Sequence, residues 1–386
     1  MSMKTAIAMI FRCGLLLLLC WGCKEPFEPE VANIDHSILV VEGHIEVGGG
    51  ETTISVARTR PVYDSLSHMP IHWAIVSLEA EDGSSWSLHL QGNGDYSLLE
   101  PLSESQDYRL RIQTDGQTYL SDWLTPIITP EISEISFEKN AGDVSIYVST
   151  QGNERAQYFM WEYEETWIYQ SPYRSSYKYD LERRDVVPLT TDDQLTFRCW
   201  NWDRTRQINI SSSESYQNDY IYQKELLKIG SLSEKLGERY SILVTQRAID
   251  RDAFVFWEAI RKNSNDIGGI FSPLPSNLTG NMHNIDDPQE PVIGYITAGK
   301  SAQKRQYINR RDVDPWRIVI EDYHTCAVDT VIPRDYNAYF VQSMFVPLSP
   351  YCLEGGGCIG YFATTRACAD CSMRGGVLER PDFWED

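Results

Sequence analysis

Short segments that alternate between apolar and polar residues, separated by tight-turn dipeptides, constrain the fold of this chain most. Residues 108–112 follow this alternation, so one side of the segment is buried and the other faces water. Asp82-Gly83 and Asp115-Gly116 lie between such segments, and Asp-Gly is a strong β-hairpin signal. Together with the lack of a long helix, the pattern predicts an immunoglobulin-like β-sandwich over residues 37–127.

A second, larger β-rich domain is expected over residues 128–386. Single cores stop growing at about 250–300 residues, and this chain has 386. One amphipathic helix is predicted at 251–263, with Asp250 as its N-cap and Glu258 and Lys262 paired one turn apart. Its apolar stripe is formed by Ala253, Phe254, Trp257 and Ile260. The predicted fold class is therefore mostly β, with a Cys-rich C-terminal cap.

The N-terminus is typical of a bacterial lipoprotein signal peptide over residues 1–22. Its basic residues precede an apolar run from Gly14 to Leu19 that is too short to span a membrane. Gly22-Cys23 is the lipoprotein cleavage signature, and it predicts that Cys23 carries a diacylglyceryl group and a further acyl chain such as palmitate. The alternative is an ordinary cleaved signal in which Cys23 occurs by chance. Residues 23–36 form an acidic, proline-containing tether.

The charge balance excludes one class of partner. The formal net charge is −21, and such a surface repels nucleic acid and anionic headgroups. We therefore predict no nucleic-acid partner.

Six cysteines follow the signal segment and tether: Cys199, Cys326, Cys352, Cys358, Cys368 and Cys371. An even number of cysteines in an exported protein predicts disulfides, and six cysteines allow 15 pairings. The last four, which include a Cys-x-x-Cys pair, are also compatible with a zinc site. The same cysteines could instead be redox-active or remain free thiols.

Aromatic residues are concentrated between residues 159 and 222. Those of 159–169 are two or four positions apart, so on a strand they would share one side. Core packing is one interpretation, and a platform that stacks sugar or an aromatic ligand is the other. The candidate ligand or partner contacts are Trp161, Tyr163, Trp167, Tyr169, Tyr173, Tyr177, Trp200 and Trp202.

No catalytic motif stands out. The chain has no Gly-x-Ser-x-Gly elbow, no His-Glu-x-x-His and no phosphate-binding loop. Ser301 and Lys304 match Ser-x-x-Lys, but the companion motifs of that enzyme class are missing. We predict no catalytic residue, no metal and no cofactor.

Four segments together resemble one known family: Leu39–Gly43 with its glycine turn, Trp161–Trp167, Phe254–Tyr295 and Cys368–Trp384. The chain resembles the outer-membrane lipoproteins of Bacteroidota that carry a domain of unknown function and are encoded beside TonB-dependent receptors. The resemblance covers nearly all of the chain after the signal segment. It supplies no catalytic residues.

The resemblance implies an accessory role, not an enzymatic one. The protein would help a TonB-dependent outer-membrane transporter to capture cargo. The aromatic-rich sequence of residues 167–222 predicts that these residues are the contacting loops. The acidic tether resembles the signal that sends such lipoproteins to the extracellular side of the cell outer membrane; the periplasmic leaflet is the alternative. A surface hydrolase of glycan or peptide, or an adhesive surface protein, remain alternative functions. Ser65 and Thr330 lie in sequences that resemble O-glycosylation sites of exported proteins in that phylum.

Overall fold

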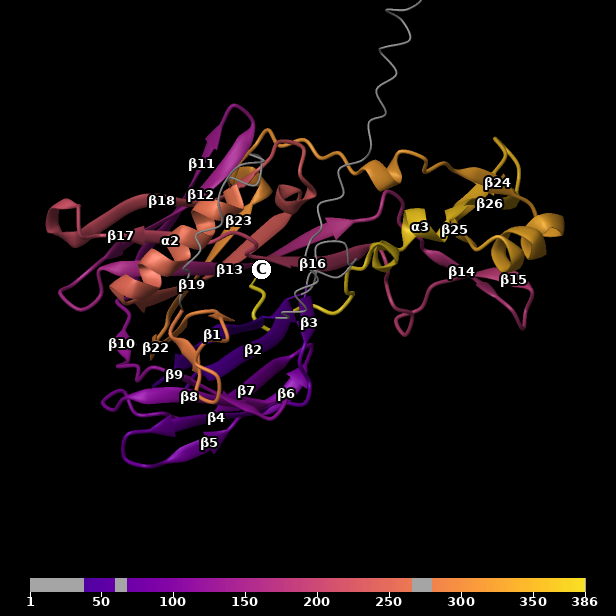
Figure 1. Cartoon of the computed structure of the whole chain (residues 1–386). Helices are drawn as coiled ribbons and strands as arrows, with labels where there is room; N and C mark the ends of the chain where they lie inside the picture. Colours follow the sequence, from indigo (N-terminus) through magenta and orange to yellow (C-terminus); the bar gives the residue numbers. More distant parts are fainter. Residues whose placement is uncertain (1–37, 60–67, 266–279, 386) are drawn as a thin grey trace, which may run out of the picture. The chain divides into compact units, whose positions relative to one another are not determined.

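The structure is a computed structural model that describes residues 38–59, 68–265 and 280–385 (Figure 1). Residues from Ile38 onward belong to one unit, and strands dominate it. The predicted signal peptide, the tether, Cys23 and Ser65 lie outside the described residues. No helix within the described ranges is both long enough and apolar enough to cross a membrane.

Two sheets form a β-sandwich at the N-terminal end, as predicted. The first runs in the order β10-β22-β1-β2-β7-β6, with β21 beside β1 and β3 beside β2. Its strands are β1 (Leu39–Glu46), β2 (Glu51–Thr59), β3 (His68–Pro70), β6 (His89–Gly92), β7 (Asp95–Leu99), β10 (Ile127–Ile128), β21 (Val292–Ile293) and β22 (Ile296–Lys300). The second runs β20-β9-β8-β4-β5. Its strands are β4 (Ile75–Ala80), β5 (Ser85–Ser87), β8 (Tyr108–Thr114), β9 (Gln117–Ser121) and β20 (Met282–Asn284).

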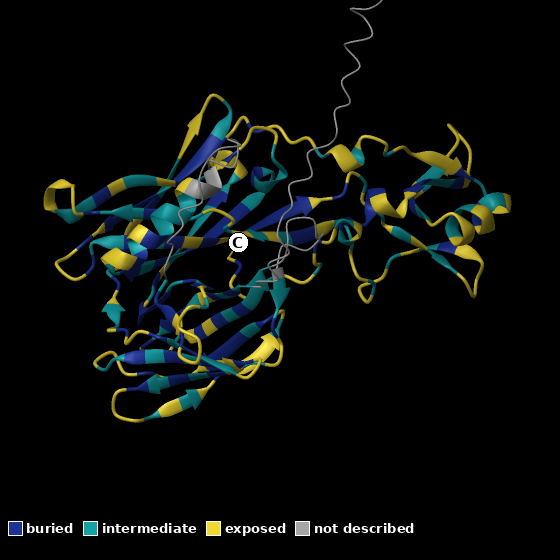
Figure 2. Cartoon of the chain, in the orientation of Figure 1, coloured by how far each residue is buried: buried dark blue, intermediate teal, exposed yellow. Residues whose placement is uncertain are grey.

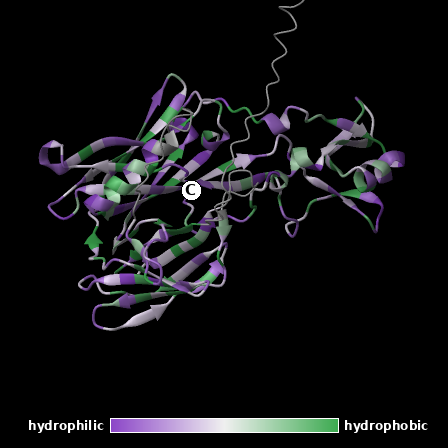
Figure 3. Ribbon diagram, in the orientation of Figure 1, coloured by the Kyte–Doolittle hydropathy of each residue, from purple (hydrophilic) through white to green (hydrophobic). Residues whose placement is uncertain are grey.

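The alternation in the sequence accounts for the core of this sandwich. Tyr108, Leu110 and Ile112 of β8 are fully buried, together with Leu39 of β1 and Ile54 of β2. Side chains of a strand alternate between its two sides, so the intervening arginines face outward. Burial and hydropathy alternate in the same way along other strands (Figures 2 and 3). The predicted Asp-Gly hairpins join β4 to β5 and β8 to β9.

Three strands of the sandwich come from residues 282–300, so the prediction that these residues belong to the second domain is wrong. β22 lies parallel to β1, with Gly43 opposite Ile296, and β20 pairs with β9. Two parallel strands must be joined by a long crossover connection and not by a tight turn. No turn dipeptide beside β1 or β22 therefore predicts that they pair.

Two further sheets enclose the second core. One runs β16-β13-β19-β23 with β17 beside β13, and the other runs β11-β12-β18. The strands are β11 (Ile132–Asn140), β12 (Asp143–Gln151), β13 (Tyr158–Gln170), β16 (Arg198–Arg204), β17 (Asn209–Ser212), β18 (Tyr220–Ile229), β19 (Arg239–Ile249) and β23 (Ala302–Asn309). We call the β16-β13-β19-β23 sheet the central sheet. Its core side packs on the other sheet through residues such as Phe159, Ile146 and Val244.

The predicted helix is α2 (Arg251–Asn265). Asp250 caps it, because its Oδ1 accepts the Ala253 N–H at 2.7 Å, and Glu258 pairs with Lys262 at 3.1 Å. The predicted apolar stripe is wrong in one respect. Phe256, which is not in the predicted stripe, is buried with Ala253, whereas the other predicted members are half-buried.

A small third core joins the hairpin β14 (Tyr177–Asp180) and β15 (Asp185–Pro188) to the three-stranded sheet β24-β26-β25. The strands of that sheet are β24 (Asp329–Val331), β25 (Phe345–Cys352) and β26 (Cys358–Thr365), and the short helix α3 (Arg366–Ala369) follows. The remaining helical turns are η1 (Gln217–Asp219), η2 (Glu234–Leu236), η3 (Arg310–Asp312), η4 (Glu321–Tyr323), η5 (Pro333–Asp335), η6 (Asn337–Gln342) and η7 (Cys371–Arg374). Part of the predicted loop region 167–222 is thus a folded hairpin that shares a core with the C-terminal region.

All six candidate cysteines form disulfides, as predicted. The pairs are Cys199–Cys371, Cys326–Cys368 and Cys352–Cys358. The zinc and free-thiol interpretations are wrong, because a disulfide sulfur is not available as a thiolate ligand.

A buried histidine makes the stability of the sandwich depend on pH. His44 Nε2 donates to the Gly299 carbonyl at 3.1 Å, and Nδ1 lies within hydrogen-bond distance of the Thr297 hydroxyl, at 2.8 Å. Burial, assisted by the charge of Arg247, lowers the pKa of His44 to about 3. The unfolded chain binds a proton below pH 6.5 that the folded chain does not bind. The stability that neutral His44 contributes is therefore fully present above pH 6.5. It is lost progressively as the pH falls from 6.5 toward 3.

We expect the free energy of unfolding to fall by about 2 kcal/mol between pH 7 and pH 5 from this group alone. His44→Gln keeps a donor for Gly299 and removes the titration, so its free energy of unfolding should change less over this interval. Urea unfolding at pH 5, 6 and 7 measures both proteins. Parallel pH profiles for the two proteins would contradict the assignment to His44.

Candidate functional site

Four of the eight aromatic residues predicted to contact a ligand or partner are core residues. Trp161, Tyr163, Trp167 and Tyr169 all lie on the core side of β13. Trp161 Nε1 donates to Gln246 Oε1 at 2.8 Å, and the Tyr169 hydroxyl donates to the Cys371 carbonyl at 2.5 Å. These four residues therefore pack in the core, and the prediction that they contact a ligand or partner is wrong. A buried ring leaves no surface for a ligand.

Two tyrosines of the set help to hold the C-terminal region in place. The Tyr173 N–H donates to the Cys368 carbonyl at 3.2 Å. Tyr177 packs against Tyr361 in the third core, with ring centroids 5.1 Å apart. Both tyrosines are half-buried.

The remaining two residues lie on β16, at the edge of the central sheet. Trp200 is 8% exposed and packs with Ile168 and Trp384. Trp202 is two residues further along the strand, so its side chain points to the same side of the sheet, but it is 58% exposed. This side is opposite the core side of the central sheet, and we call it the outer side.

A groove of about 850 Å³ lies at Trp202. Its apolar lining comes from Trp200, Trp202, Val377, Pro381 and Phe383, and its polar lining comes from Glu164, Glu165, Thr166, Asp203, Arg204, Thr205 and Arg206. The binding groove, as we name this set, combines strands β13 and β16 with the C-terminal residues 377–383. No sequence motif joins these segments, because residues 377–383 follow β16 by more than 170 positions.

The C-terminal segment is tied to the central sheet at three points. Val377 and Trp200 exchange backbone hydrogen bonds of 2.8 and 2.9 Å. Trp384 packs edge-on against Trp200 and Tyr307, and the Tyr307 hydroxyl donates to the Phe383 carbonyl at 2.6 Å. These contacts bury Trp384 but leave Phe383 42% exposed at the groove.

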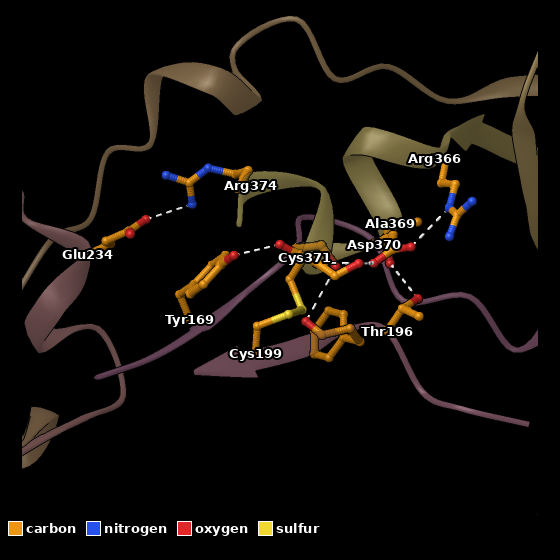
Figure 4. Close-up of a disulfide and its surroundings, with 12 residues drawn as sticks. Tyr169, Thr196, Cys199, Glu234, Arg366, Ala369, Asp370, Cys371 and Arg374 are labelled. Atoms are coloured by element: carbon orange, nitrogen blue, oxygen red, sulfur yellow. Dashed lines mark hydrogen bonds and ion pairs between the residues drawn. A yellow bond between two sulfur atoms is a disulfide. The ribbon is translucent and has the colours of Figure 1, made fainter. Parts of the chain in front are cut away.

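The disulfide Cys199–Cys371 holds the start of this segment beside β16 (Figure 4). The Cys371 N–H donates to the Thr196 carbonyl at 2.8 Å. Arg374 forms ion pairs of 2.8 Å with Glu234 and with Asp322. Burial opposes the charge of Arg374, but these two carboxylates raise its pKa.

Three charged residues of the groove, Glu165, Asp203 and Arg206, form ion pairs. Burial opposes ionisation of Asp203, but the Arg204 N–H and the charges of Lys235 and Arg206 together lower the pKa of Asp203. Arg206 contacts Asp203 at 3.0 Å, and Lys235 contacts Glu165 at 2.7 Å. At neutral pH the Asp203 carboxylate is therefore an ionised acceptor at the edge of the groove.

A second pocket, of about 910 Å³, is lined by the 122–130 connection, Asp250, Asn281 and Tyr295. Its main polar groups serve the fold. Asp250 caps α2 and accepts from the Tyr295 hydroxyl at 3.1 Å, and the Asn281 amide exchanges two hydrogen bonds with the Ile296 backbone. The Asp250 and Asn281 side chains of this pocket are therefore committed to the fold.

The Ser301 and Lys304 side chains of the Ser-x-x-Lys match have separate hydrogen-bond partners. Ser301 hydrogen-bonds Glu46, whereas Lys304 bonds the carbonyls of Ile132 and Ser133. Within the described part of the chain, no group of three or more His, Cys, Asp or Glu side chains could hold a metal ion. Thr330 is exposed on β24, where its O-glycosylation stays a prediction.

These features define a mostly β protein with two sandwiched cores, a disulfide-linked C-terminal region and a groove on the outer side of its central sheet. The chain belongs to the family described as "Domain of unknown function (DUF4249)", whose model matches residues 24–305. The match includes β13 and β16 and ends before the C-terminal part of the groove.

Curated proteins and solved structures do not extend this family assignment. No curated protein matches the chain. A solved two-domain fibronectin type III segment from chicken tenascin is 12% identical, with 53% of this chain and 88% of that segment covered and a TM-score of 0.16. A likeness at that score carries no argument about fold or function.

Proposed function

We propose that this protein is a lipid-anchored, non-catalytic accessory subunit of a nutrient uptake system. In this proposal, acylated Cys23 holds it at the extracellular side of the cell outer membrane, and it binds cargo for a TonB-dependent transporter. The observation that carries the binding role is the exposure of Trp202 and Phe383 at one groove, whereas the aromatic residues on the core side of β13 are buried. Large apolar side chains left exposed at a concave surface favour a binding role.

The N-terminal sequence supports the location. Two or more acyl chains hold a protein on a membrane where one chain gives only marginal binding. The tether 23–36 separates the anchor from the first strand, β1, and its prolines disfavour helix. A groove on a folded unit that follows such a tether can meet cargo at the membrane surface.

The location and the partnership are tested in the native host. Cys23→Ala should remove the protein from the outer-membrane fraction, because the acylated thiol is the only anchor that we propose. The wild-type protein, solubilised in detergent, should co-purify with a TonB-dependent transporter identified by mass spectrometry. Deletion of the gene should slow growth only where that transporter's substrate is limiting. Unchanged fractionation of the variant contradicts the anchor, and normal uptake without a co-purifying transporter contradicts the accessory role.

A further inference from the structure

We propose that the binding groove holds a neutral oligosaccharide, with one sugar ring stacked on Trp202. This inference rests on the binding role proposed above and names the class of its ligand. Its support comes from the exposed aromatic rings, the balance of charge and the closed backbone edge of β16.

The aromatic rings of the groove suit the apolar faces of sugar rings. Trp202 is 58% exposed, and an indole offers a flat surface of large area with few rotatable bonds. Phe383 is 42% exposed at the same groove, and the Arg305 guanidinium lies 3.8 Å from its ring centroid. Arg305 covers one face of this ring, and the part of Phe383 that stays exposed is a second apolar contact. Two such contacts favour an oligosaccharide over a single sugar.

Polar side chains next to Trp202 suit the hydroxyl groups of a sugar. Thr166 lies directly across from Trp202, and Glu164 lies across from Arg204. Directly opposite side chains on paired strands are about 5 Å apart, within reach of one bound ring. A carboxylate accepts from a sugar hydroxyl and a guanidinium donates to one, so this neighbourhood serves both hydrogen-bonding roles of a hydroxyl.

The charge of the groove is balanced, which favours a neutral ligand. Three carboxylates, Glu164, Glu165 and Asp203, and two cations, Arg204 and Arg206, line the groove. A third cation, Lys235, lies beside the groove and pairs with Glu165 and Asp203. Two of these cations already contact carboxylates of the groove. In addition, the formal net charge of −21 opposes the approach of an anionic glycan.

The edge of β16 is closed to an extended peptide. Trp200 uses its outward N–H and carbonyl to pair with Val377, so the backbone groups of Trp202 and Arg204 also point outward. The Asn201 side chain accepts the Trp202 N–H at 3.0 Å, and the Asp203 side chain accepts the Arg204 N–H at 2.9 Å. A peptide strand would have to displace both side chains before it could pair with this edge.

The test uses the full-length lipoprotein purified in detergent and isothermal titration calorimetry. The probes are four neutral hexasaccharides, based on maltose, cellulose, xylan and mannan, together with an oligogalacturonate and an unstructured decapeptide. We expect at least one neutral hexasaccharide to bind, and Trp202→Ala to weaken that binding by about tenfold or more. Trp73→Ala is the matched control, because Trp73 is 56% exposed and is not part of the groove. The control should bind as the wild type does.

Three results would overturn the inference: no neutral hexasaccharide binds, only the oligogalacturonate or the peptide binds, or Trp202→Ala binds as tightly as Trp73→Ala. Equal melting temperatures of the two variants show that any difference is local. Fractionation and transporter co-purification do not depend on Trp202. A negative titration with intact co-purification therefore rejects the oligosaccharide and leaves the accessory role standing.

Discussion

Replacing Gly294 with alanine is expected to destabilise the protein by about 4 kcal/mol or more. Gly294 separates β21 from β22, and both strands pair with β1. Its φ is +140°, and a Cβ on it would lie 1.8 Å from the Val41 carbonyl oxygen, a backbone atom of β1. Either β1 must move or the parallel pairing must break. Urea unfolding followed by circular dichroism measures the loss.

Gly92 provides the matched control for this substitution. Its φ is +136°, close to that of Gly294, but a Cβ there would have no heavy atom within 4 Å. Gly92→Ala therefore isolates the backbone strain, which costs about 1–3 kcal/mol. Equal losses in the two variants would mean that the close approach of β1 to Gly294 contributes nothing.

Removing the disulfide Cys199–Cys371 should cost about 4–5 kcal/mol, because it joins residues 172 positions apart. Longer loops lose more entropy on closure, so the unfolded chain is constrained most by this bond. Among the described residues, the double variant Cys199→Ala/Cys371→Ala leaves no unpaired thiol that could exchange with the other disulfides. Guanidinium unfolding under non-reducing conditions measures its stability.

Cys352–Cys358 is the comparison, because it spans only six positions and should contribute about 2 kcal/mol. If the two double variants lose the same stability, loop length does not govern the effect. The long-range pair also has a local consequence. Cys371 precedes the segment that carries Val377 and Phe383, so its loss should loosen the C-terminal part of the binding groove as well.

Local patterns were sufficient to predict much of the architecture. Alternation in residues 108–112 and the Asp-Gly turns predict antiparallel hairpins because strand and turn are adjacent in the chain. Asp250 and the spacing of Glu258 and Lys262 predict α2 for the same reason, since capping and side-chain pairing act within one or two turns. An even cysteine count predicts disulfides but leaves their pairing open.

The sequence by itself determined the strand-rich fold class, the helix, the disulfide-forming cysteines and the five aromatic residues that share one side of β13. Only the tertiary structure decided which aromatic residues remain exposed. Trp200 and Trp202 point to the same side of β16. Trp384, close to the C-terminal end of the sequence, covers Trp200 and leaves Trp202 exposed. The parallel β1–β22 pair and the groove likewise join segments far apart in sequence. Such contacts depend on packing and loop closure, which leave no periodic signal in either segment alone.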